Sequence, residues 1–245
     1  MKIIFIGVGE AFDPQNGNTS TLICSKTNLL IDCGYAVPYF YLQNNFNADF
    51  LDAIYITHCH ADHTFGLINL LSRFAFDGRT KPLTIIGQPG TESLVNNLFH
   101  LGDPTVLSLY KYPIKFLETI QPIDFNEFSL SFAETIHPVK NYAIKVQTKE
   151  HCLTITGDGL MTEELKELLK GSETIVAHTQ QLLASHPVHN TIEEFVEFLP
   201  QLPTVKNVAF VHLSRNEDRN KIEDYLKQEA GINFIVPKPN QIFDL

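Results

Sequence analysis

The order of apolar and polar positions along the chain predicts short strands at its start and a mixture of strands and helices after them. Short strand-like runs of apolar residues predict strands at residues 2–6, 21–24, 28–32, 53–57, 83–87, 114–117, 130–136, 142–148, 153–156, 208–212 and 233–236. Helical spacing predicts helices at residues 65–74, 90–98, 162–169, 191–199 and 216–230. No repeat or linker separates these elements, so we expect one α/β or α+β domain over residues 1–245.

One segment in this pattern carries a dense group of metal-ligand side chains. Residues 58–63 read His-Cys-His-Ala-Asp-His and follow the strand predicted at residues 53–57. Side chains alternate along a strand, so His58 and His60 point the same way while Asp62 and His63 follow on a turn. This geometry suggests two adjacent metal ions, one at His58 and His60 and one at Asp62 and His63. The alternative interpretation, a turn that is rich in His by chance, is far less favoured than a metal site.

The run matches the His-x-His-x-Asp-His signature of the metallo-β-lactamase superfamily, whose members are mostly hydrolases. Further stretches resemble its ribonuclease Z branch: residues 5–12 (FIGVGEAF), 18–20 (NTS), 30–34 (LIDCG) and 78–90 (GRTKPLTIIGQPG). The resemblance implies a four-layer αββα sandwich and a dinuclear metal centre. Imidazole and carboxylate ligands suit zinc, with manganese or iron as alternatives.

The resemblance also implies the remaining metal ligands. His137 follows a predicted strand and would join His58 and His60, and His212 ends another and would join Asp62 and His63. Asp158 lies between two glycines, and the Asp at this place bridges the two metals in the family. Each of these residues alone is more often an ordinary surface or core residue. In this order, and each at a strand end, they favour a metal centre.

The expected chemistry is hydrolysis. Two adjacent metals acidify a bridging water to hydroxide, which attacks carbonyl carbon or phosphorus, and the cations neutralise the charge that develops. Asp62 is expected to serve also as a general base, because it would touch both a metal and the water. Seven metal ligands are therefore predicted: His58, His60, Asp62, His63, His137, Asp158 and His212.

A proton donor for the leaving group is suggested by the ribonuclease Z branch, which has a His-Ser-Thr run about 20 residues before its last ligand. Here His189-Asn190-Thr191 stands there, which makes His189 the candidate general acid. Equally weighted is a plain helix start, in which Asn190 or Thr191 caps the helix and His189 is solvated. The branch orients its acid with a Glu, and this chain has Thr179 at that position. His178 is a candidate supporting group, and His186 is a weaker candidate acid.

Composition and spacing favour a small substrate. The chain has 18 Lys and Arg against 28 Asp and Glu, a net charge of −10, which opposes binding to a long polyanion. Ribonuclease Z enzymes that act on transfer RNA bind it with a long arm inserted between the third metal ligand and the bridging Asp. Only a hairpin fits between His137 and Asp158 here. We therefore expect a phosphodiesterase for small phosphodiesters such as cyclic nucleotides.

Three alternatives stay open: a ribonuclease Z-type RNA 3′-processing nuclease, a carboxyl-ester or lactone hydrolase, and a non-catalytic module that binds a phosphorylated ligand. The four cysteines show no close pairing, and no apolar run approaches a membrane span, so we expect a cytoplasmic protein without membrane contact. The ribonuclease Z branch usually pairs through the segment after the metal motif. Its apolar character here predicts a homodimer through Phe65, Leu67, Leu71, Phe74 and Phe76.

Overall fold

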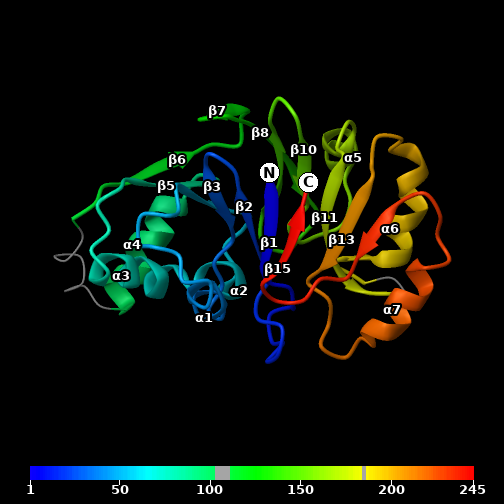
Figure 1. The fold of residues 1–245 in the computed structure, drawn as a ribbon, viewed down its shortest axis with the longest axis horizontal. Coiled ribbons are helices and arrows are strands. Elements are labelled where there is room, and N and C mark those ends of the chain that lie inside the picture. The colour runs from blue at the N-terminus through cyan, green and yellow to red at the C-terminus, as the bar shows by residue number, and fades with distance from the viewer. Residues whose placement is uncertain (103–110, 184–185) are drawn as a thin grey trace.

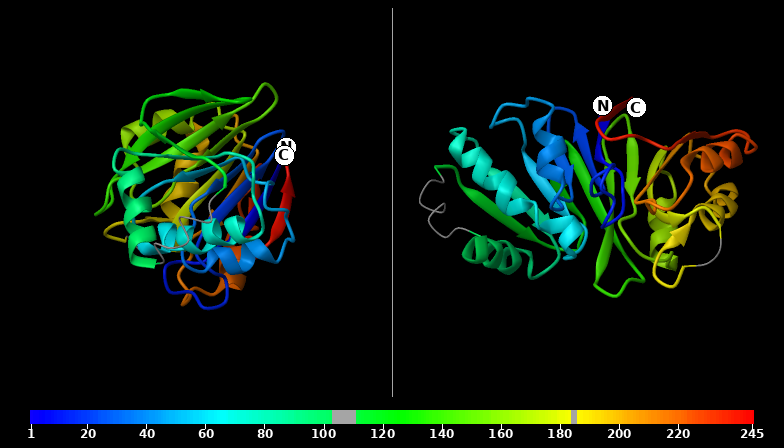
Figure 2. Two further views of the ribbon diagram at one scale, coloured as in Figure 1. Left: turned by 90° about the vertical axis from the view of Figure 1, so that its left-hand side faces the viewer. Right: turned by 90° about the horizontal axis from the view of Figure 1, so that it is seen from below.

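Two β-sheets packed face to face form the middle of the protein, and helices cover the outer face of each (Figure 1). The computed structural model describes residues 1–102, 111–183 and 186–245. Seen from below, the helices flank the two sheets on opposite sides (Figure 2). This is the four-layer αββα sandwich that the family resemblance implied.

The first sheet has the strand order β15-β1-β2-β3-β4-β5-β6. Its strands, in chain order, are β1 Lys2–Gly7, β2 Ser20–Cys24, β3 Asn28–Ile31, β4 Ala53–Ile56, β5 Leu83–Gly87, β6 Ile114–Glu118 and β15 Gln241–Asp244. The helices of this half are α1 Val37–Leu42, the single turn α2 Ala61–Thr64, α3 Leu67–Phe76 and α4 Thr91–Gly102. Their apolar side chains pack with those of the sheet in one buried cluster that includes Val37, Leu70 and Ile85.

The second sheet has the strand order β14-β13-β11-β10-β9-β8-β7, with β12 paired to β11. The strands are β7 Ile123–Phe125, β8 Phe128–Thr135, β9 Asn141–Gln147, β10 Cys152–Ile155, β11 Thr174–Gln181, β12 Asn190–Thr191, β13 Asn207–Val211 and β14 Asn233–Ile235. Its helices are α5 Glu163–Leu169, α6 Ile192–Phe198 and α7 Arg219–Leu226, with a short 3-10 turn at Leu199–Gln201. These helices share a buried cluster with the sheet that includes Leu165, Phe195 and Phe210.

A third apolar cluster lies between the sheets and joins the two halves. Phe5 and Ile23 come from the first sheet, and Leu130 and Ile144 from the second. Because strands such as β1 and β2 are buried on both faces, their apolar runs are nearly continuous instead of alternating.

Several parallel strands bring their carboxyl ends to one edge of the sandwich. In the first sheet β3, β4 and β5 are parallel neighbours. In the second sheet β10, β11 and β13 are parallel neighbours, and β8 runs parallel to β10 because β9 is antiparallel to both. The residues that follow these strands therefore meet at this edge, as is common for sites in α/β proteins.

Some expected elements differ from the structure. The helix predicted at residues 65–74 begins at Leu67, and the one predicted at residues 216–230 shortens to Arg219–Leu226. The pattern missed α1, α2, β7, β11, β12 and β15. For β11 the reason is its short apolar run: Ile175, Val176 and Ala177 are followed by the buried polar residues His178 and Thr179.

The segment predicted to form a dimer packs largely inside its own molecule. Leu67, Leu71 and Phe74 lie in the buried cluster of the first half, and only Phe65 and Phe76 are exposed. Five apolar positions on α3 and its flanks therefore do not make an exposed apolar face, and the homodimer stays a prediction. No helix among the described residues is long and apolar enough to cross a membrane.

Candidate metal centre

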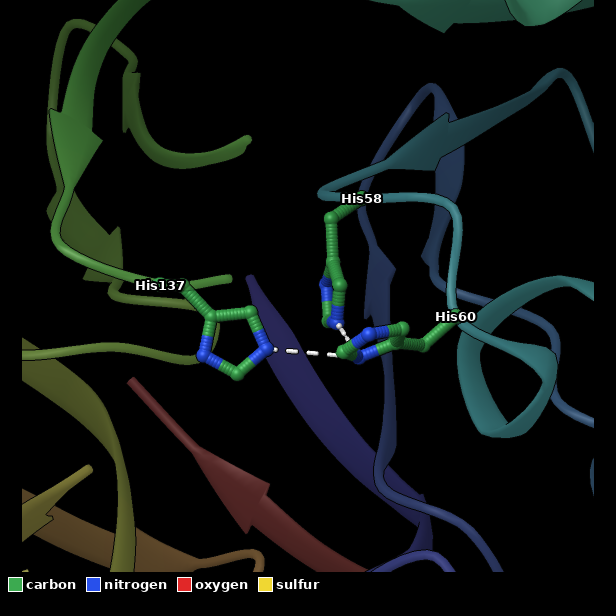
Figure 3. A group of neighbouring side chains, drawn as sticks. All are labelled: His58, His60 and His137. Carbon is green, nitrogen blue, oxygen red and sulfur yellow. Dashed lines mark hydrogen bonds between the residues drawn. The ribbon is translucent and has the colours of Figure 1, made fainter. Parts of the chain in front are cut away.

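Three imidazoles converge at the shared edge, from two loops of different sheets. His58 follows β4 and His60 precedes the short helix α2, Ala61–Thr64, while His137 follows β8. The Nδ1 atom of His60 lies 3.0 Å from His58 Nε2 and 3.3 Å from His137 Nε2 (Figure 3). All three rings point toward one another in Figure 3, as the His-x-His spacing predicted for the first two.

A second group forms beside the first. Asp62 and His63 lie in the single turn of α2, and His212 follows β13 with a positive φ of 64°. The Oδ2 atom of Asp62 lies 3.3 Å from His63 Nε2 and 3.6 Å from His212 Nε2. The turn after the motif strand is thus one helical turn, which brings Asp62 and His63 together with His212.

Asp158 lies between the two groups. Its Oδ2 atom is 3.3 Å from His212 Nε2, 3.4 Å from His63 Nε2 and 3.7 Å from His58 Nε2. The flanking glycines, Gly157 and Gly159, both have positive φ values, and a Cβ atom at Gly157 would lie 2.5 Å from Asn141 Oδ1. Glycine is therefore needed for the tight turn that places this carboxylate.

Two buried side chains support the ligand atoms from behind. The carboxylate of Asp32, at the end of β3, accepts hydrogen bonds from the Thr57 backbone N–H and hydroxyl and lies 2.7 Å from His63 Nδ1. His178 Nδ1, on β11, lies 3.0 Å from Asp158 Oδ1. The sequence indicated a supporting role for His178 but none for Asp32. The available signal was a carboxylate directly after an apolar strand in the LIDCG stretch.

The protonation preferences differ between the ligand side chains. Burial alone raises the pKa values of Asp62 and Asp158, but the neighbouring imidazoles of His212 and His63 outweigh it and hold both pKa values below the usual range. Burial lowers the pKa values of His58 and His137. Burial alone would also lower the pKa values of His63 and His212, but neighbouring carboxylates, Asp158 above all, outweigh it and raise both. Because metals bind ionised carboxylates and neutral imidazoles, a cation at His63 and His212 would displace their protons.

Several buried ligand atoms have no hydrogen bond among the described residues. They are His63 Nε2 and both ring nitrogens of His212. Buried polar atoms normally find partners, so these atoms point to a missing one. The candidate ligand atoms gather in groups within 4.8 Å of one another: His58–His60–His137, His58–His63–Asp158 and Asp62–His63–His212. Nitrogen and oxygen donors of this kind fit divalent cations such as zinc, manganese or iron.

His189 lies next to this centre and is buried, which contradicts the alternative in which its side chain is solvated. Its ring centroid is 5.2 Å from those of both His137 and His212. The capping alternative is correct for its neighbour, because Thr191 caps α6 in a capping box with Glu194. Burial lowers the pKa of His189 to about 3, so its imidazole is neutral in the metal-free protein. His189 also forms a possible metal-binding group with His137 and Asp158.

Three further residues of the motif regions, His186, Cys59 and Thr179, lie outside the two ligand groups. His186 is 5.1 Å from His189, ring to ring, and joins none of the possible metal-binding groups. Cys59 is partly exposed, and burial raises the pKa of its thiol, which agrees with a non-nucleophilic role. Thr179, which stands where the family has a Glu, is buried, and its hydroxyl has no hydrogen bond to the described residues.

Comparison with known proteins places this centre in a family. The family model described as "Anti-Pycsar protein Apyc1" matches residues 1–238. The chain belongs to the anti-Pycsar protein Apyc1 family. A ribonuclease Z of Pediococcus pentosaceus is 30% identical over 189 residues, which are 74% of this chain and 58% of that protein. The chain thus spans less than two thirds of that curated relative.

Solved structures confirm the fold of this Apyc1-family protein. The metallo-β-lactamase fold protein YhfI from Bacillus subtilis aligns with a TM-score of 0.79 at 20% identity, over 99% of this chain and 98% of that one. The short form of human tRNase Z aligns with a TM-score of 0.80 at 18% identity, over 100% and 99%. The metallo-β-lactamase fold is therefore confirmed, and the 30% identity to a ribonuclease Z agrees with the predicted ribonuclease Z-like branch. Ribonucleases are hydrolases, so the similarity to a ribonuclease Z agrees with the predicted enzyme class.

Proposed function

We propose that residues 1–245 act as one metal-dependent phosphodiesterase domain that hydrolyses small phosphodiesters, with cyclic nucleotides as the substrate class. The observation that carries the proposal is the convergence of two His- and Asp-containing groups around Asp158. Such a paired arrangement is typical of two-metal hydrolysis of phosphate esters.

In this proposal each side chain has a definite task. His58, His60 and His137 would hold one cation, Asp62, His63 and His212 the other, and Asp158 would touch both. Two divalent cations, when bound, lower the pKa of water and neutralise charge that develops on phosphoryl oxygens. Asp62, ionised and beside the centre, would accept the proton of the attacking water. Asp32 and His178 would keep His63 and Asp158 oriented.

The short hairpin beside the centre supports a small substrate. Between His137 and Asp158, β9 and β10 pair directly, and the Thr148 backbone N–H closes their turn on the His151 carbonyl at 2.9 Å. This segment therefore contains a two-stranded hairpin and no inserted arm. The net charge of −10 also disfavours a long polyanion.

The test is hydrolysis of cyclic nucleotides and of a transfer-RNA precursor by the same zinc- or manganese-loaded protein. We expect kcat/KM to be higher for at least one cyclic nucleotide than for the precursor. A plot of log kcat/KM for that nucleotide against log salt concentration should have a slope no steeper than about −1, because a single phosphate displaces few counterions. Correct 3′ cleavage of the precursor, with no turnover of any cyclic nucleotide, would contradict the proposal.

The second candidate function is ribonuclease Z-type RNA processing, which the 30% identity to the Pediococcus protein favours. An armless enzyme would need another surface to hold RNA. A steep fall of precursor cleavage with salt, indicating several phosphate contacts, is the signature expected of this alternative.

We also propose that His189 donates a proton to the leaving oxygen. A bound phosphate anion would raise the pKa of the buried imidazole from its low value toward neutrality. His189→Ala should then slow a cyclic nucleotide roughly 10²-fold or more. A nitrophenyl diester, whose leaving group needs no proton, should be slowed much less.

The matched control is His100→Ala, which removes an exposed imidazole. Equal losses on both substrates in His189→Ala would assign His189 to phosphate binding or to metal binding with His137 and Asp158. Metal analysis of that variant separates the two cases. The zinc identity and the cytoplasmic location remain predictions.

A further inference from the structure

Two exposed aromatic rings lie on the loops next to the candidate metal centre. Phe12 is 71% exposed and Tyr35 is 50% exposed, although both belong to segments tied to the ligand loops. We define these two side chains as the aromatic rim. Single exposed aromatic residues are common, so the attachment of these two to the centre is what matters.

Phe12 is attached to the loop that carries His212. The His212 backbone N–H donates to the Val8 carbonyl at 2.9 Å, and Gly9 forms a parallel bridge with Leu213. Phe12 is three residues beyond Gly9, and three residues span at most about 10 Å. The Phe12 backbone therefore lies within about 10 Å of Gly9, which pairs with the residue after the predicted ligand His212.

Tyr35 is attached to the loop that carries Asp62 and His63. The Cys33 backbone N–H donates to the His63 carbonyl at 2.8 Å. At Gly34 a Cβ atom would lie 1.8 Å from the Asp62 carbonyl oxygen, so the two backbones are in direct contact. The Tyr35 hydroxyl donates to the Ala11 carbonyl, next to Phe12. This hydrogen bond joins the two loops of the aromatic rim.

An ion pair holds Phe12 in place. Glu10 is buried, and its Oε2 atom accepts the Phe12 backbone N–H at 2.8 Å while Oε1 accepts Arg215 Nη1 at 2.5 Å. The Arg215 guanidinium lies 5.7 Å from the centroid of the Phe12 ring, a cation–π distance. Because Glu10 neutralises Arg215, this ion pair carries no net charge that would attract a further phosphate.

A flat, uncharged ring surface beside a centre for phosphate chemistry fits the base of a nucleotide. We propose that the aromatic rim binds the nucleobase of the substrate by stacking, with Phe12 as the main surface. This inference rests on the proposed function and adds to it a binding site for the nucleobase of the substrate. Stacking on an aromatic side chain generally changes affinity about five- to a hundredfold and tolerates different bases, because every base has a π face.

The kinetic test uses a 3′,5′-cyclic nucleotide and the corresponding cyclic ribose phosphate without a base. Phe12→Ala should raise KM for the nucleotide roughly tenfold with little change in kcat, and should leave the abasic substrate unaffected. Phe12→Tyr should retain low KM, and Phe12→Leu, which is apolar without a π face, should not. Phe76→Ala is the matched control, because Phe76 is also 71% exposed but lies at the end of α3.

A binding measurement keeps the inference testable without turnover. Calorimetry of the metal-loaded protein should show that a nucleoside 5′-monophosphate binds roughly tenfold more tightly than ribose 5-phosphate, and that Phe12→Ala removes the difference. Equal binding of the two ligands would overturn the nucleobase site. In that case, hydrolysis of the abasic cyclic phosphate would still support the proposed phosphodiesterase function. Equal kinetic losses of Phe12→Ala on both substrates, or loss of self-association instead of nucleotide binding, would also overturn it.

Discussion

Asp158→Ala is expected to reduce hydrolysis of every phosphodiester by at least about 10³-fold, the scale of loss when a central catalytic group is removed. Asp158 Oδ2 lies within 3.4 Å of both His63 and His212 and within 3.7 Å of His58, so its removal affects both ligand groups at once. The variant should also bind fewer than the roughly two metal ions per chain expected of the wild type on the two-metal principle. Metal analysis by mass spectrometry and steady-state kinetics measure the two effects.

Asp124→Ala is the control for this change, because Asp124 is an exposed carboxylate on β7, in another part of the second sheet. His60→Ala should resemble Asp158→Ala, since His60 Nδ1 lies between His58 and His137. Circular dichroism should show that both variants remain folded, because the three apolar clusters carry the core. Wild-type-like turnover of either variant at saturating metal would contradict the assignment of the centre.

Asp32→Asn is expected to lower metal affinity or turnover about 10- to 100-fold, although Asp32 is not itself a predicted ligand. Its carboxylate receives two hydrogen bonds from Thr57 and contacts His63 Nδ1, and an amide cannot accept all three. Asn is the informative substitution because Asp32 has a φ of 62°, a conformation that Asn tolerates and Ala does not. Titration of the metal-free protein with zinc measures the affinity.

Asp52→Asn provides the matched control. Asp52 precedes β4, at the opposite end of the strand from Thr57, and accepts the Asn28 backbone N–H at 2.8 Å. It also pairs with Lys81. The substitution should cost some stability and leave metal affinity unchanged. An unchanged zinc affinity in Asp32→Asn would show that His63 is oriented without this carboxylate.

Local sequence patterns predicted much of the fold because the strands and helices near the site carry strong local signals. β5 agrees with its predicted boundaries, and β4 and β13 end one residue before theirs. Thr191 caps α6, as one of the two sequence-based alternatives for this segment predicted. The missed strand β11 lacks such a signal, because its apolar run of three residues is followed by the buried polar residues His178 and Thr179.

The sequence by itself determined the identity of the ligand chemistry, since His58, His60, Asp62 and His63 lie within six residues and their directions follow from local geometry. Only the tertiary structure decided how His137, Asp158 and His212 meet them, because these residues follow strands of the second sheet. It also decided that Asp32 supports His63, that His189 is buried, and that Leu67, Leu71 and Phe74 face the interior. Burial and contact between distant segments depend on how the two sheets pack, and no local pattern encodes that packing.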